Sequence, residues 1–162
     1  MKVYFASDHA GFQLKEALIP HVRSLGYEVK DVGPVALKPD DDYPSCVRPA
    51  IQAILKDMQV DLHSRAIILG GSGQGEAIVA NRFHGIRAAV YYGIGGEQTD
   101  SEGRKINIIE SVRLHNDTNV LSLGARFITE EEARVVVQLW LELPFSDEEK
   151  HKRRVKQIDE VT

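Results

Sequence analysis

The stretch from Ala66 to Arg82, AIILGGSGQGEAIVANR, decides the fold because an apolar run passes through a glycine-rich turn directly into a helix-like segment. A short, uninterrupted apolar run is typical of a strand that is covered on both faces of a parallel sheet. Glycines let the chain turn sharply and approach a ligand closely, and the first N–H groups of the following helix can bind an anion. The stretch therefore predicts a parallel α/β sheet with an anion site at residues 71–75.

Three familiar glycine motifs do not match this turn. The phosphate-binding loop of nucleotide hydrolases ends in Gly-Lys-Ser/Thr, whereas this chain reads Gly-Glu-Ala at 75–77. The dinucleotide motif G-x-G-x-x-G follows the first strand, whereas Gly71, Gly73 and Gly75 are spaced two apart after the predicted third strand. The G-x-S-x-G motif of hydrolases fails at Gln74. A ligand other than a nucleotide is therefore favoured over a bare connecting turn.

Composition limits the class of protein. The chain has 162 residues, 43% of them hydrophobic, a net charge of −4 and one cysteine, Cys46. We expect one soluble domain with a substantial core, no disulfide and no zinc site. The acidic balance argues against nucleic acid as a partner, and no apolar run is long enough to predict a membrane span. The start, MKVYFASDHAG, has no leader pattern, so we expect a cytoplasmic protein.

Strand-like and helix-like patterns alternate along the chain. This alternation predicts one α/β domain, 1–162, with a doubly wound, parallel, five-stranded sheet. The predicted strands lie at 2–6, 27–32, 66–70, 86–92 and 119–124. Ligands of such sheets bind beyond the carboxyl ends of the strands.

Three polar clusters adjoin these strands, and we expect all three at the carboxyl ends. SDHAG follows the first strand, GGSGQGE follows the third, and HNDTN stands between a helix and the fifth. Taken singly, Asp8 is more often a helix cap, and His9 and His115 are more often surface or cap residues. Taken together with Glu76, they are suited to moving protons beside a phosphorylated substrate.

Two helices of different character end the chain. The first, from Thr129, and the second, from Ser146, each open with a predicted capping box, because Glu132 and Glu149 follow three residues later. Segment 146–162 offers few apolar residues for burial: Val155, Ile158 and Val161. We expect it to be an arm that docks on a partner subunit, although a solvated basic helix fits the run equally well.

Five blocks in order carry a resemblance that covers nearly the whole chain: SDHAGFQLK, DDYP, GGSGQGEAIVANRFHGIRAA, RLHNDTNVLSLGARF and FSDEEKHKRRV. They resemble the family of type B ribose-5-phosphate isomerases, which also holds galactose- and allose-6-phosphate isomerases. The resemblance implies a Rossmann-like domain and a homodimer with shared active sites. It further implies a cofactor-free enzyme that interconverts ribose 5-phosphate and ribulose 5-phosphate through an enediolate. A hexose-6-phosphate isomerase and a non-catalytic phosphosugar-binding module are the alternatives.

The resemblance also assigns a base. Many members of the family have a proton-abstracting cysteine where this chain has Gly70, whereas one branch reads like this chain and uses a glutamate. Glu76 is therefore the candidate base, and Cys46, which lies elsewhere, inherits no role. Because Glu76 lies in the first turn of a helix, the helix dipole is expected to lower its pKa, and desolvation would have to compensate.

The remaining site residues follow position by position. His115 matches the residue that opens the sugar ring, and Ser72 adds a hydroxyl where the enediolate oxygen would lie. Lys150 stands where the family usually has an arginine, so charge is kept but the bidentate fork is lost. The resemblance implies substrate contacts for Asp8, His9, Gly71, Gly73, Gly75, Asn116, Arg126, Lys150 and Arg154. No metal is implied. The connection at 93–107 is longer than usual and predicts an exposed loop, more simply a neutral insertion than a determinant of substrate choice.

Overall fold

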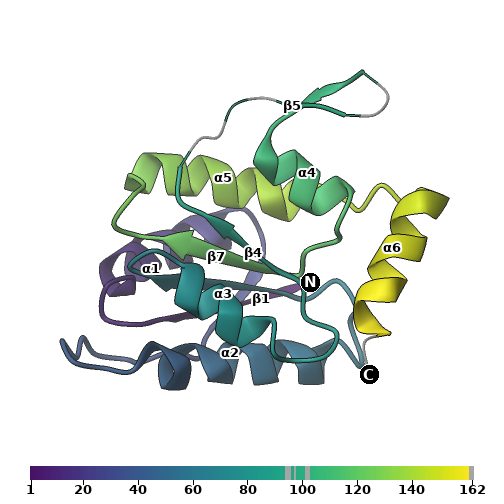
Figure 1. Ribbon diagram of the computed structural model, residues 1–162. Coiled ribbons are helices and arrows are strands. Elements are labelled where there is room, and N and C mark those ends of the chain that lie inside the picture. The colour runs from purple at the N-terminus through teal and green to yellow at the C-terminus, as the bar shows by residue number, and fades with distance from the viewer. Residues whose placement is uncertain (94–95, 97, 101–102, 161–162) are drawn as a thin grey trace.

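The computed structural model describes residues 1–93, 96, 98–100 and 103–160. In this part of the chain, five parallel strands form one sheet in the order β2-β1-β3-β7-β4, as the alternating pattern predicts. Helices cover both of its faces (Figure 1). The chain contains the following elements: β1 (Lys2–Ser7), α1 (Phe12–Ser24), β2 (Glu28–Asp31), α2 (Tyr43–Asp57), β3 (Arg65–Gly70), α3 (Gln74–Ala80), β4 (Ala88–Tyr91), β5 (Gln98–Thr99), β6 (Lys105–Ile106), α4 (Ile108–Leu114), β7 (Val120–Gly124), α5 (Glu130–Glu142) and α6 (Glu149–Asp159).

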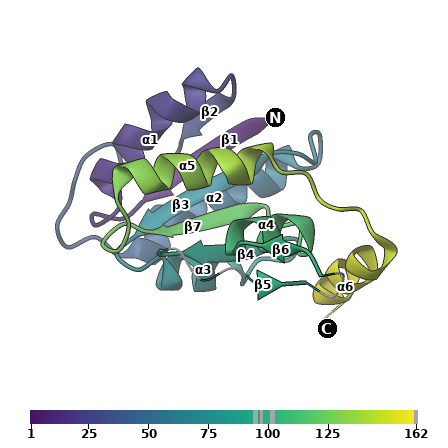
Figure 2. The same ribbon diagram turned by 90° about the horizontal axis from the view of Figure 1, so that it is seen from above.

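The core has two layers, one on each face of the sheet. Val3 and Phe5 point to the face that α1, α4 and α5 cover, whereas Tyr4 and Ala6 point to the face that α2 and α3 cover. Figure 2 shows α1 and α5 side by side over the first of these faces. Because successive strand side chains alternate between faces, a sheet covered on both sides needs the continuous apolar runs seen in this sequence.

The register of β3 and β7 sets the geometry of the site. Ala66 pairs with Val120, and Gly70 pairs with Gly124, so the two strands end together. The turns after Gly70 and after Gly124 therefore emerge at the same edge of the sheet, and Ala125 N donates to the Gly70 carbonyl at 2.8 Å. Residues that precede Val120 lie at the opposite edge.

Two local expectations need correction. The 93–107 connection is not wholly irregular, because β5 and β6 pair as a short antiparallel hairpin, although 94–95, 97 and 101–102 lie outside the described residues. The capping box at Ser146 is wrong: α6 begins after Glu148 without a side-chain cap, since the Ser146 hydroxyl bonds His151 instead.

Candidate active site

The glycine-rich turn between β3 and α3 is hydrogen-bonded to the neighbouring strand β7. Gly73 has a φ of 75°, the left-handed conformation that favours glycine, and starts α3. The Ser122 hydroxyl of β7 donates to the Gly73 carbonyl at 2.7 Å. The Ser72 hydroxyl accepts from Gln74 N at 3.3 Å, which places this hydroxyl at the amino end of the helix. The turn thus presents a hydroxyl and the first helical N–H groups at the carboxyl edge of the sheet.

Glu76 occupies the space that a side chain at position 70 would fill. A Cβ atom added to Gly70 would lie 2.6 Å from Glu76 Oε2 and closer still to Oε1 and Cδ. The side chain of Glu76 is buried, with 4% of the residue exposed. The absence of a side chain at Gly70 therefore lets the carboxylate reach back from α3 to the end of β3.

Burial decides the ionisation of Glu76. Desolvation raises the pKa of Glu76, the nearby charge of Asp8 raises it further, and a hydrogen bond from its own backbone opposes the change. The net pKa lies above the ordinary value of 4.5. The expectation from the helix dipole was therefore in the wrong direction, because α3 is short and the protein itself desolvates the carboxylate before any substrate binds.

Asp8 and His9 extend the same edge of the sheet. Asp8 is buried, its N–H donates to the Leu69 carbonyl at 3.1 Å, and its Oδ1 accepts from Gly11 N at 3.0 Å. Asp8 therefore closes the turn before α1, but it does not cap this helix, because the N-cap residue is Gly11 and no side chain caps it. The charge of Asp8 also acts on Glu76. Among the described residues, Asp8, His9 and Asp41 each offer a ligand atom within 4.8 Å of the others, so this group could hold a cation.

Two site residues, Asp41 and Tyr43, were not singled out from the sequence. Asp41 Oδ1 accepts from His9 N at 3.1 Å and lies 2.8 Å from His9 Nδ1. Tyr43 lies against Gly75, where an added Cβ would fall 2.8 Å from its ring. Both belong to the acidic connection KPDDDYP, and its run of aspartates before a Tyr-Pro pair was the signal that could have identified them.

Arg126 joins this half of the site from the turn after β7. Its N–H donates to the Gly71 carbonyl at 3.1 Å. A Cβ added to Gly71 would be 3.4 Å from the guanidinium carbon of Arg126, so the guanidinium lies over the glycine turn. A guanidinium beside the predicted anion site would suit a phosphate or a carboxylate.

Cys46 is unsuited to act as a base or nucleophile. The residue is buried, with 4% exposed, and burial together with hydrogen bonding to Asp41 raises the pKa of its thiol to about 11. A thiol with that pKa stays protonated at neutral pH.

His115 does not lie with Glu76 in the same chain, which corrects the expectation that all three polar clusters share one edge. His115 follows α4 and precedes β7, so it stands at the amino end of this strand. The five residues of β7 separate the two ends by about 13 Å at the usual rise per residue. Asn116 lies beside His115 at the amino edge, and its carbonyl accepts from Arg87 Nε at 3.2 Å. The error arose because a cluster before a parallel strand emerges at the edge opposite to a cluster after one.

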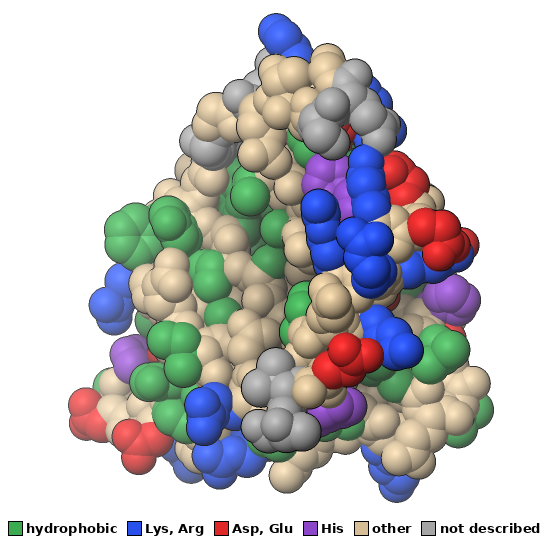
Figure 3. Space-filling model, turned by 45° about the vertical axis from the view of Figure 1, so that its right-hand side comes forward, with side chains coloured by type: hydrophobic (Ala, Val, Ile, Leu, Met, Phe, Trp, Pro, Cys, Tyr) green, Lys and Arg blue, Asp and Glu red, His purple; other side chains and the backbone are tan. Residues whose placement is uncertain are grey.

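The basic residues of α6 gather around His115 at this amino edge. The rings of His115 and His151 are 4.4 Å apart, and His151 is buried against the Ser146 hydroxyl, 2.8 Å from Nδ1. Burial, with the neighbouring His115, lowers the pKa of His151. Lys150 and Arg154 belong to the same helix. Figure 3, in which the side of the molecule that carries α6 is turned toward the reader, shows Lys and Arg side chains gathered on this side. One chain therefore presents two clusters of predicted site residues, which we term half-sites, at opposite ends of its sheet.

The α6 helix packs on its own chain in this structure, at His84 and Gly85. His84 Nε2 donates to the Asp159 carbonyl at 3.0 Å, and Gly85 N donates to Asp159 Oδ1 at 3.2 Å. Of the three apolar residues, Val155 is half-buried, Ile158 is exposed, and Val161 lies outside the described residues. Docking of this helix on a partner stays a prediction.

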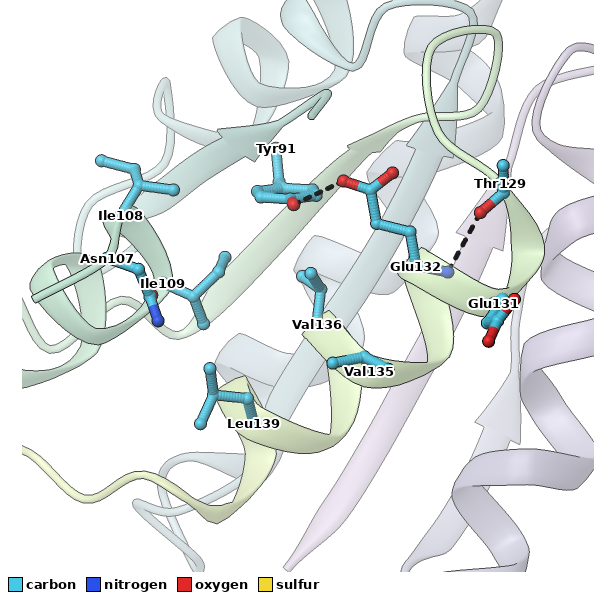
Figure 4. Close-up of a pocket in the computed structure, with 10 residues that line it drawn as sticks. All are labelled: Tyr91, Asn107, Ile108, Ile109, Thr129, Glu131, Glu132, Val135, Val136 and Leu139. Carbon is cyan, nitrogen blue, oxygen red and sulfur yellow. Dashed lines mark hydrogen bonds between the residues drawn. The ribbon is translucent and has the colours of Figure 1, made fainter. Parts of the chain in front are cut away.

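A separate pocket of about 460 Å³ lies between α4 and α5, away from the glycine turn (Figure 4). Its walls are mainly apolar side chains from the two helices, including Ile108, Val135 and Leu139. At one end, Tyr91 donates to Glu132 Oε1 at 2.7 Å. This contact corrects the capping box predicted at Thr129: the Thr129 hydroxyl accepts from Glu132 N, but the Glu132 carboxylate turns to Tyr91.

Sequence comparisons place the chain among sugar-phosphate isomerases. Residues 3–158 match the model of the ribose/galactose isomerase family. The chain is 35% identical over 156 residues to ribose-5-phosphate isomerase B of Mycobacterium tuberculosis, covering 96% of this chain and 86% of the relative. It is 34% identical to the Escherichia coli protein of the same name, covering 99% and 95%. Among the described residues, no helix is both long and apolar enough to cross a membrane.

Solved structures agree with this placement. The fold superposes on a ribose 5-phosphate isomerase of Thermotoga maritima with a TM-score of 0.80, at 36% identity and with 99% and 98% of the two chains covered. It also superposes on ribose-5-phosphate isomerase B of Mycoplasma genitalium, solved with bound ribulose-5-phosphate, with a TM-score of 0.81, 27% identity and coverage of 98% and 93%. From the family match, the identities and the shared fold, the chain belongs to the ribose/galactose isomerase family.

Proposed function

We propose that the protein interconverts ribose 5-phosphate and ribulose 5-phosphate. Its relatives across nearly the full length carry that activity in their names, and one related structure holds the ketose product. The residues of the two half-sites fit the chemistry, because aldose–ketose isomerisation needs a base, an oxyanion site and cationic groups for the phosphate. No redox or hydrolytic group is required for the transfer of one proton between adjacent carbons.

Glu76 is the proposed base. The observation that carries this assignment is the overlap between its carboxylate and the position of a side chain at residue 70. In cysteine-containing members of the family, the reactive group would project from that position. Here glycine leaves it open, and the carboxylate of Glu76 supplies a proton acceptor at the same place. A pKa raised by burial improves its strength as a base at neutral pH.

The other groups complete the reaction. Loss of the carbon-bound proton to Glu76 leaves an enediolate, whose charge the Ser72 hydroxyl and the N–H groups of the glycine turn would stabilise. Asp8, beside Glu76, would contact the sugar hydroxyls. His115 would move a proton between the ring oxygen and the anomeric hydroxyl to open the sugar before isomerisation. Asn116 would bind the opened sugar beside it.

The phosphate would lie between the guanidinium of Arg126 on one half-site and the cations of α6 on the other. Of the basic residues of α6, the resemblance selects Lys150, which pairs with Glu148 at 3.0 Å, and the exposed Arg154. Arg126 could bind two phosphate oxygens at once, whereas Lys150 contributes a point charge.

Two chains are needed to form a complete site. Glu76 lies beyond the carboxyl end of β3, and His115 lies at the amino end of β7. A homodimer would therefore bring the carboxyl ends of the strands of one chain to the amino ends of the strands of its partner. Exposed apolar side chains extend beside the edge strand β4: Tyr92 and Phe127, whose rings are 6.3 Å apart, followed by Ile108 and Val135. An apolar surface along an edge strand is typical of a protein interface.

Complementation tests the shared site and the isomerase activity together. Glu76→Gln and His115→Asn chains should each be nearly inactive on ribose 5-phosphate. After unfolding and refolding as an equal mixture, about half of the dimers are hybrids with one intact site, so about a quarter of wild-type activity should return. Activity that stays at the level of the single variants would show that each site is built within one chain.

A hexose 6-phosphate is the second candidate substrate, because the matched family is described by both ribose and galactose isomerases. Ketose formation should be compared for ribose 5-phosphate, allose 6-phosphate and galactose 6-phosphate. A higher kcat/KM for a hexose would reassign the substrate while keeping the mechanism. The absence of turnover with all three would favour a phosphosugar-binding module.

A further inference from the structure

Asp41 holds His9 at two points. Its Oδ1 accepts from the backbone N–H of His9 at 3.1 Å and lies 2.8 Å from Nδ1 of the ring. The Asp41 side chain is 10% exposed, whereas that of His9 is 32% exposed. The carboxylate is therefore buried behind the imidazole, and the imidazole faces outward at the edge that carries Glu76.

Several contacts hold the Asp41 carboxylate in place. Its Oδ1 takes both contacts from His9, and the Cys46 thiol hydrogen-bonds the same carboxylate. Cys46 is buried in the first turns of α2, and Asp41 N donates to the Lys38 carbonyl at 3.3 Å. The carboxylate is thus fixed both by its own turn and by a helix of the core.

An ionised carboxylate can only accept hydrogen bonds, which fixes the tautomer of its partner. The proton of the neutral imidazole must therefore lie on Nδ1, and Nε2, on the far side of the ring, is left as an acceptor. The same oxygen, Asp41 Oδ1, also holds the backbone of His9. Rotation of the ring would break the contact between Oδ1 and Nδ1.

We propose that Asp41 is a positioning residue that holds His9 in the Nδ1–H tautomer and presents Nε2 to the bound sugar phosphate. This inference rests on the proposed function only for the identity of the ligand. It adds the β2–α2 connection to the site as a segment that orients His9. Its effect should therefore reach the substrate through His9 alone.

The chain offers a matched control in the adjacent Asp40, which is exposed. Asp41→Asn and Asp40→Asn make the same change of charge one residue apart. For Asp41→Asn we expect KM for ribose 5-phosphate to rise roughly 10-fold with kcat changed less than about 3-fold, because one charge-assisted hydrogen bond is weakened. Asp40→Asn should match the wild type. Equal effects of the two variants would overturn the proposal.

A double-mutant cycle shows whether the effect passes through His9. Once His9→Asn has removed the imidazole, adding Asp41→Asn should raise KM no further. Additive effects would overturn the proposal. So would loss of wild-type activity on treatment with a chelator, because Asp8, His9 and Asp41 would then serve a bound cation.

A spectroscopic measurement decides the proposal without any substrate. In ¹⁵N NMR spectra at a pH where the ring is neutral, His9 of the wild type should show the Nδ1–H tautomer, and Asp41→Asn should reduce this preference. A wild-type Nε2–H tautomer would refute the role of Asp41 even in an active isomerase. Conversely, an Nδ1–H tautomer in a protein without turnover would overturn the proposed function but not the positioning of His9.

Discussion

Substitution of Gly70 by alanine should inactivate the protein through the displacement of Glu76. The new methyl group would lie 2.6 Å from Oε2, and ordinary contact begins at 3.4 Å. Even this farther oxygen must therefore retreat by the difference of 0.8 Å, and the nearer Oε1 by more. A misplacement of about 1 Å in a reacting group can reduce catalysis roughly 10²-fold, so we expect kcat to fall by about that factor.

The fold should tolerate this substitution. The atoms that clash are at the end of a flexible side chain, so we expect a loss of about 1–3 kcal/mol in the free energy of unfolding at most. Turnover of ribose 5-phosphate and urea unfolding should be measured on the same preparations. Gly96→Ala is the control, because an added Cβ there meets nothing within 4 Å.

The double variant Gly70→Ala/Glu76→Gln tests the cause. If the methyl group acts only by moving the base, it should add little to the loss that Glu76→Gln already produces. A Gly70→Ala protein with kcat within about 3-fold of the wild type would refute the reasoning, since the base would then tolerate a displacement that general base catalysis does not.

The remaining predictions concern ionisation, ring opening and the terminal helix. Folding raises the pKa of Glu76, so the folded state binds its proton more tightly than the unfolded state, and ionisation costs stability as pH rises from the ordinary value of 4.5 through the raised pKa. Glu76→Gln should therefore unfold at a higher temperature than the wild type at neutral pH, with the difference vanishing in acid, and equal stabilities at neutral pH would contradict the burial argument. His115→Asn should depress turnover of ribose 5-phosphate far more than turnover of erythrose 4-phosphate, because the latter cannot close the same ring. Glu76→Gln should depress turnover of both sugars alike. Equal losses for the two sugars with His115→Asn would assign His115 to binding or to the enediolate step. Truncation after Phe145 should weaken both phosphate binding and dimer formation in sedimentation experiments, and a fully active dimer would exclude a role for α6.

The sequence by itself determined the parallel sheet and the position of the glycine-rich turn. Both depend on local rules: continuous apolar runs such as AIILG require cover on both faces, and the glycines around Ser72 permit the left-handed turn that Gly73 adopts. The five sequence blocks, read in order, also indicated the family, because each block is recognised from its own residues without reference to the others. None of these conclusions required knowledge of distances between remote segments.

Only the tertiary structure decided which polar residues meet. It placed His115 at the amino end of β7 and Glu76 beyond the carboxyl end of β3, and it brought Asp41 from the β2–α2 connection onto His9. It also reversed the expected direction of the shift in the pKa of Glu76. The position of Glu76 in the first turn of a helix can be predicted from the sequence, whereas the burial of its carboxylate cannot. Desolvation and pairing depend on what the rest of the chain packs around a group, and that information is absent from the residues next to it.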